Sequence, residues 1–149
     1  MDIQSDYSNE RMIRSSLGPN AQITGMVFDP ENYENNLKIT NEKYADFILQ
    51  TDIILLGMGD DGHFASLFPN DATSEKLLSE NLVGIFNTGA HNEPKKRITC
   101  SMQMIMNSKI ILLMITGKKK KEVLQNQALS LPIHKLLNRR NDIQIYYAD

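Results

Sequence analysis

The chain has 149 residues, 41% of them hydrophobic and 23% charged, which is enough apolar material for the core of one globular domain over residues 1–149. Its formal net charge of −2 excludes a general nucleic-acid binder, which needs clustered positive charge. The single Cys100 excludes an intrachain disulfide framework, and the longest apolar run, Ile110 to Ile115, is far shorter than the roughly 20 residues that span a bilayer, so we expect a cytoplasmic protein that binds no membrane.

Two amphipathic helices are predicted before the first strand. Apolar residues at helical spacing indicate helices over residues 8–17 and 41–50, each with one apolar face for the core. The segment between them from Gly18 to Asn36 is rich in Pro, Gly and Asn, which predicts a surface loop.

The first predicted strand is a short, continuous apolar run from Ile53 to Leu56 that ends at Gly57, a pattern typical of a strand buried on both faces. Further strands are predicted over residues 82–86, 97–101, 109–115 and 143–147, and helices over residues 119–128 and 133–137. Strands separated by helical segments need crossover connections. The fold class is therefore α/β, with a mainly parallel sheet.

The segment GMGDDGH, residues 57–63, directly follows this first strand. Ligands of open α/β sheets bind outside the carboxyl ends of strands, and glycines there let the backbone approach a ligand or adopt positive φ. Asp60, Asp61 and His63 add titratable groups, which favours a functional site; the alternative is a polar turn with a solvent-facing histidine. His91 and His134 stand alone and are interpreted as structural or surface residues.

The run from Gly57 to Pro69, GMGDDGHFASLFP, resembles the signature of the 6-phosphogluconolactonases, which share a fold with the glucosamine-6-phosphate deaminases. Three further segments resemble motifs of that family in the same order, namely residues 8–14, 94–99 and 115–120. The resemblance implies a Rossmann-like, mainly parallel sheet with flanking helices.

The same resemblance implies hydrolysis of 6-phosphogluconolactone, a step of the oxidative pentose phosphate pathway, without a cofactor or a metal ion. A neutral imidazole suits the removal of a proton from water at neutral pH, so His63 is the expected general base. Asp61 matches the family position that would orient its ring, whereas Asp60 is expected to be a solvated loop residue. Gly57, Gly59 and Gly62 are expected to hold the substrate through their backbone N–H groups.

A phosphorylated substrate needs cationic partners, and two positions that match the family supply them. Arg97 can bind a phosphate as a fork and Lys120 as a point charge, so both are expected to converge with His63 on one cleft. Lys118, Lys119 and Lys121 are interpreted as a solvated basic turn.

Two alternatives stay open at this point. The related deaminases carry a glutamate for proton transfer five residues after the histidine, but this position is Phe68 here, which cannot relay protons. The family also carries a further N-terminal segment with a glycine-rich phosphate loop, so we expect an N-terminally truncated domain, and a non-catalytic sugar-phosphate-binding remnant is the second alternative. Loss of parallel strands would expose a sheet edge and favour self-association.

Overall fold

The computed structural model describes residues 5–26, 32–126 and 130–149. The helices in these ranges are α1 (Asn9–Leu17), α2 (Tyr33–Lys43), α3 (Ala45–Leu49), α4 (Ala72–Ser79), α5 (Met102–Met106), α6 (Lys118–Gln125) and α7 (Pro132–Arg139). The strands are β1 (Thr51–Gly57), β2 (Ile85–Gly89), β3 (Lys96–Cys100), β4 (Ser108–Thr116) and β5 (Gln144–Ala148). No helix within these ranges is long and apolar enough to cross a membrane.

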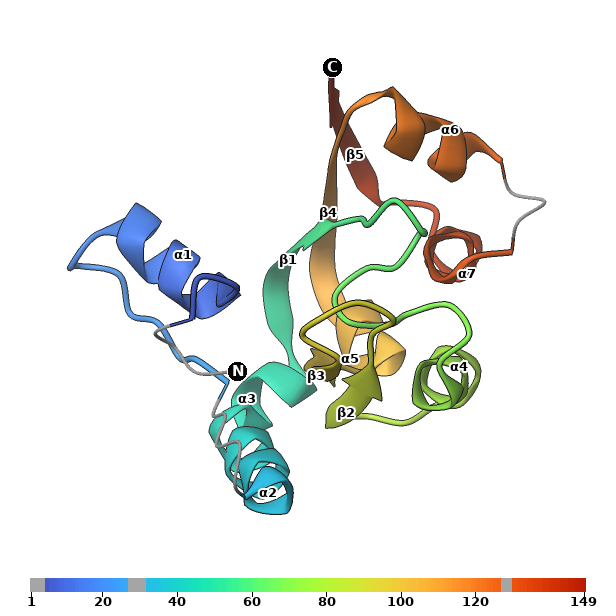
Figure 1. Cartoon of the computed structure of the whole chain (residues 1–149). Coiled ribbons are helices and arrows are strands. Elements are labelled where there is room, and N and C mark those ends of the chain that lie inside the picture. Colours follow the sequence, from blue (N-terminus) through green and yellow to red (C-terminus); the bar gives the residue numbers. More distant parts are fainter. Residues whose placement is uncertain (1–4, 27–31, 127–129) are drawn as a thin grey trace.

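A three-stranded parallel sheet lies at the centre of the molecule, in the order β1-β4-β5 (Figure 1). Its register pairs Leu56 with Leu113 and Leu113 with Ile145. This arrangement confirms the predicted parallel α/β sheet. The exception to parallel pairing is β2 and β3, which form an antiparallel pair. The residues between these two strands are too few for a crossover, which needs a dozen or more.

The core lies on one face of the parallel sheet. Leu56, Ile111, Leu113 and Ile115 point to this face and are almost completely buried. Helices α4, α6 and α7 lie on one side of the sheet in Figure 1, and buried side chains of α4 and α7 join the same core cluster.

The opposite face of the sheet is apolar and open among the described residues. Ile53 and Leu55 on β1 are 55% and 61% exposed, and Met114 and Tyr146 on the neighbouring strands are also exposed. The prediction that the first strand is buried on both faces was therefore wrong. Its continuous apolar sequence does not reveal that helices cover only one side.

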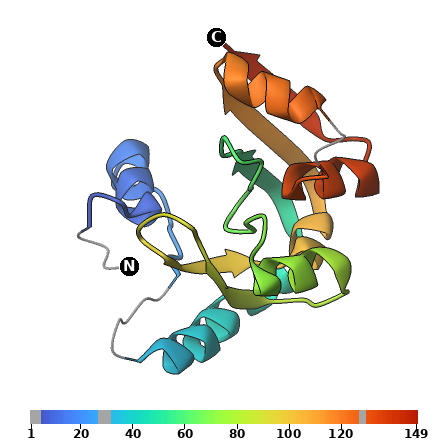
Figure 2. The same ribbon diagram turned by 45° about the vertical axis from the view of Figure 1, so that its right-hand side comes forward.

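The helices near the N-terminus differ most from the sequence expectation. Helix α1 forms as predicted, with the Ser8 side chain capping the Arg11 N–H, but none of its residues is buried and Met12 is 60% exposed. Helix α2 begins at Tyr33, inside the predicted loop, and the predicted helix over residues 41–50 is interrupted at Tyr44. In both views α1 stands apart from the three-stranded sheet (Figure 2).

The remaining boundaries shift by a few residues. The strand expected over residues 82–86 is observed as β2, and the short helices α4 and α5 were not predicted. Helix α6 ends at Gln125, whereas the last residues of the helix expected over 119–128 lie outside the described residues. Helix α4 is capped by Asp71, whose carboxylate accepts from the Ser74 N–H. A search for apolar periodicity does not detect such a capping residue.

Candidate active site

The loop that follows β1 is held by its own backbone. The Gly59 N–H donates to the His63 carbonyl at 2.9 Å, and the Gly62 N–H donates to the Gly59 carbonyl at 3.0 Å. Gly62 has φ +76°, a conformation that side chains with a Cβ rarely adopt. Its carbonyl accepts from the Ile133 N–H at 3.0 Å, so the loop is also fixed to the start of α7.

His63 and Asp61 form a hydrogen-bonded pair within this loop. The His63 Nδ1 lies 2.6 Å from the Asp61 Oδ1, which also accepts from the His63 backbone N–H at 3.2 Å. Burial raises the pKa of Asp61, but the hydrogen bonds from His63 outweigh burial and leave this pKa below its ordinary value. The ionised carboxylate can only accept, so Nδ1 carries the proton and Nε2 of the neutral ring keeps a free lone pair.

Gly59 is required by the close approach of this pair. A Cβ at Gly59 would lie 2.2 Å from the His63 ring and 2.7 Å from the Asp61 Oδ1. A Cβ at Gly57 would meet no atom within 4 Å. The structure thus explains Gly59 and Gly62 through geometry, whereas the expected substrate contact of all three glycines stays a prediction.

Gly59→Ala is expected to break the hydrogen bond between His63 and Asp61, because the added methyl group occupies the space of the imidazole. Overpacking of this kind costs about 1–3 kcal/mol. The measurements are chemical denaturation and the NMR resonance of the hydrogen-bonded Nδ1 proton. Gly57→Ala is the matched control and is expected to keep both; an unchanged Nδ1 resonance in Gly59→Ala would contradict this geometry.

Phe68 connects the histidine to Arg97. The centroids of the Phe68 and His63 rings are 4.5 Å apart with an interplanar angle of 40°, and the Arg97 Cζ lies 6.0 Å from the Phe68 centroid. Arg97 is half-buried, and this burial lowers the pKa of its guanidinium. From the sequence alone, Phe68 is notable only because it cannot relay protons. No sequence signal showed its contacts, because they depend on how the chain folds back after His63.

The chain folds back at Ala65, which has φ +49°, and is then fixed to the antiparallel pair. The Ser66 N–H donates to the Thr99 hydroxyl at 3.1 Å, and the Thr88 hydroxyl donates to the Ser66 carbonyl at 2.7 Å. This places the segment after His63 beside β3, the strand that carries Arg97.

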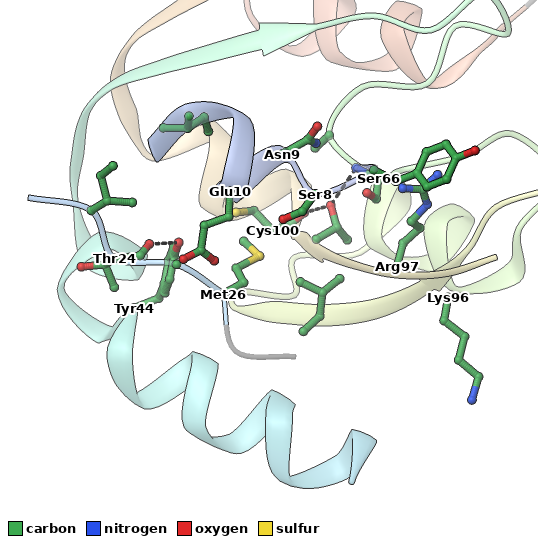
Figure 3. A pocket seen from close by; sticks show the side chains of 17 residues that line it. Ser8, Asn9, Glu10, Thr24, Met26, Tyr44, Ser66, Lys96, Arg97 and Cys100 are labelled. Carbon is green, nitrogen blue, oxygen red and sulfur yellow. Dashed lines mark hydrogen bonds between the residues drawn. The ribbon is translucent and has the colours of Figure 1, made fainter. Parts of the chain in front are cut away.

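A cavity of about 370 Å³ lies between α1, β3 and the segment containing Ser66 (Figure 3). Arg97 and Lys96 line one part of it, and Glu10, Tyr44 and Cys100 line another. His63 does not line this cavity, although it reaches Arg97 through Phe68. The sequence motifs assigned no site role to Glu10, although it lies in the family-like segment 8–14, and Tyr44 lies in none of these motifs.

The first turn of α6 lies beside the same loop. The Lys119 Nζ is 3.0 Å from the Asp60 Oδ2, and both side chains are exposed. The expectation that Asp60 is solvated is confirmed, with the addition of this ion pair. Lys120 is the half-buried neighbour of Lys119, and its convergence with Arg97 and His63 stays a prediction.

Two residues outside the loop have the structural roles expected of them. His134 is 2% exposed, and its Nδ1 accepts from the Leu131 N–H while its Nε2 donates to the Val123 carbonyl. Cys100 is partly buried, and burial raises the pKa of its thiol to about 11, which favours the protonated thiol at neutral pH.

Known proteins are similar to this chain over most of its length. The family model of the glucosamine-6-phosphate isomerases and 6-phosphogluconolactonases matches residues 1–143. The chain belongs to this family. A 6-phosphogluconolactonase of Rhizobium meliloti (strain 1021) is 29% identical over 156 residues, which cover 97% of this chain and 67% of the relative. The chain spans about two thirds of the length of the curated relatives that it matches.

Solved structures of the family have the same fold. The crystal structure of a 6-phosphogluconolactonase from Shewanella baltica OS155 superposes with a TM-score of 0.88 at 28% identity, covering 100% of this chain and 68% of that one. A monomeric glucosamine-6-phosphate deaminase superposes with a TM-score of 0.58 at 24% identity, covering 80% of this chain and 54% of that one, which shows the shared fold alone.

Proposed function

We propose that this protein hydrolyses 6-phosphogluconolactone to 6-phosphogluconate in the pentose phosphate pathway. The observation that carries the proposal is the His63–Asp61 pair, which leaves Nε2 able to accept a proton. Both His63 and the half-buried Arg97 lie against the ring of Phe68. The curated relatives with the same activity in their names support it. We place the reaction in the cytoplasm, consistent with the single unpaired Cys100.

In the proposed reaction His63 acts as the general base. Its Nε2 takes a proton from water while the water oxygen attacks the lactone carbonyl carbon, and the ionised Asp61 stabilises the resulting imidazolium. The tetrahedral intermediate then collapses, the bond between the carbonyl carbon and the ring oxygen breaks, and the imidazolium returns the proton to that oxygen. The backbone N–H groups of Gly59 and Gly62 already donate to the His63 and Gly59 carbonyls, so we assign neither of them to the oxyanion.

The phosphate group is the proposed partner of Arg97 and Lys120. Burial of the Arg97 guanidinium removes part of its hydration, which a phosphate dianion would replace with charge-assisted hydrogen bonds. Lys120 stands on the first turn of α6, where an anion is also favoured by the helix dipole.

The alternative of a deaminase is disfavoured by Phe68. Its ring packs against His63 at the position where the deaminase pattern carries a glutamate, so this position supplies no group for proton transfer. The alternative of a non-catalytic sugar-phosphate-binding protein differs from our proposal in turnover and not in binding.

The test measures acid release from 6-phosphogluconolactone by the 149-residue chain, with the spontaneous opening of the lactone subtracted. We expect hydrolysis above that background and binding of 6-phosphogluconate. Binding without turnover would support the non-catalytic alternative, and the absence of both would overturn the proposal.

Self-association through the exposed β1 edge is a further part of the proposal. β1 is an edge strand of the sheet, and its open face carries Ile53 and Leu55. We expect the sedimentation coefficient to rise with protein concentration. Leu55→Lys, which adds charge to the edge, is expected to keep the protein monomeric; Lys76→Glu, at an exposed position on α4, is the control for a charge change away from this edge. A monomer at all concentrations would contradict this part.

A further inference from the structure

Phe68 contacts both the proposed general base, His63, and the proposed phosphate ligand, Arg97. Its ring contacts the His63 imidazole at 4.5 Å between centroids, and the Arg97 guanidinium carbon lies 6.0 Å from the same ring. Both distances fall within the range of aromatic and cation–π contacts. His63 and Arg97 come from the loop after β1 and from β3, and one side chain therefore contacts groups on two separate elements.

The ring itself is held firmly. Phe68 is almost completely buried, and its backbone N–H donates to the Ser74 hydroxyl at 3.0 Å. This hydroxyl donates in turn to the Asp71 carboxylate at 2.6 Å, and the other oxygen of Asp71 accepts from the Gly89 N–H at 3.2 Å. Phe68 is thus anchored to the N-terminus of α4 and to the end of β2.

We propose that Phe68 is a positioning residue that fixes the proposed base His63 and the proposed phosphate ligand Arg97 relative to each other. This inference rests on the proposed function. The ring packs beside the imidazole and so limits its rotation about the hydrogen bond to Asp61, and the same ring lies against the Arg97 guanidinium. The spacing between the lactone carbonyl and the phosphate of a bound substrate must match the spacing between these two groups.

The experiment compares three variants of the 149-residue chain. Phe68→Leu keeps an apolar side chain but removes the ring, Phe68→Tyr keeps the ring, and Phe86→Leu is the control, because Phe86 packs partly buried against the core on β2. We expect Phe68→Leu to lower kcat and raise KM by about tenfold each, because tenfold corresponds to about 1.4 kcal/mol, which is within the range of one aromatic contact. Phe68→Tyr is expected to stay near the parent, and Phe86→Leu to change stability without changing kcat or KM.

Double variants separate positioning from general packing. If Phe68 acts through His63, Phe68→Leu should have no further effect on kcat in the His63→Ala background. If it acts through Arg97, Phe68→Leu should have no further effect on the affinity for inorganic phosphate in the Arg97→Ala background. Equal effects in the parent and variant backgrounds would overturn the proposal, as would Phe68→Leu with parental kcat and KM.

Two readouts do not depend on turnover and so distinguish this proposal from the proposed function. One is the nuclear Overhauser effect between the Phe68 and His63 ring protons, which is expected in the parent and absent in Phe68→Leu. The other is the affinity for inorganic phosphate. It is expected to fall about tenfold in Phe68→Leu, because this variant loses the cation–π contact that supports Arg97. If the parent binds phosphate and shows the nuclear Overhauser effect but does not hydrolyse the lactone, only the proposed function is rejected. Absence of the effect in the parent would overturn the positioning role.

Discussion

His63→Ala is expected to lower kcat for 6-phosphogluconolactone by about 10²–10⁴-fold, the usual contribution of a positioned general base. The physical reason is the loss of Nε2, the nitrogen that the hydrogen bond from Nδ1 to Asp61 leaves free to accept a proton. KM is expected to change little, because the phosphate ligands are untouched. The measurement is initial-rate kinetics at high protein concentration, corrected for spontaneous hydrolysis.

His91→Ala is the matched control for this variant. The His91 side chain is exposed, and its Nε2 lies 3.2 Å from the Pro69 carbonyl. We expect parental kinetics for His91→Ala. An unchanged kcat in His63→Ala, with the folded state verified by circular dichroism, would disprove the assignment of the base.

Arg97→Ala is expected to raise KM by about 10–100-fold with a smaller change in kcat, since a hydrogen bond to a charged group contributes about 1.5–3 kcal/mol. The guanidinium is half-buried beside Phe68, so its charge acts on a bound phosphate with less screening than a surface charge would. Steady-state kinetics and calorimetric titration with 6-phosphogluconate give the two constants.

Arg97→Lys keeps the charge but removes the planar fork, and it should restore only part of the affinity. Lys96→Ala is the control on the same strand, because Lys96 lines the cavity but is exposed. A KM for Arg97→Ala equal to that of the parent would show that the phosphate binds elsewhere.

The sequence predicted the central features of the site because they are local. The strand ending at Gly57, the glycine-dependent turn and the pairing of Asp61 with His63 all lie within a few residues of one another, and the structure contains each of them. The crossover rule likewise predicted the parallel sheet, because it depends on the order of strands and helices.

Features that depend on distant partners were not predictable. The open face of β1 has the same apolar composition as a buried one, and only the absence of a covering element in the described residues distinguishes them. The contact between Phe68 and His63 depends on the turn at Ala65 and on bonds to Thr88 and Thr99. The single-domain organisation, the substrate contacts of the three glycines and the role of Lys120 stay predictions.

The bond between His63 and Asp61 joins residues only two positions apart, whereas Arg97 reaches the site from another strand. The proposed proton transfer therefore depends on one short peptide segment, whereas the proposed substrate recognition depends on separately placed elements. A displacement of β3 relative to the loop would change which phosphate esters fit and leave the acid–base pair intact. The two properties can consequently diverge independently, so a protein with this loop can acquire a new substrate length without rebuilding its chemistry.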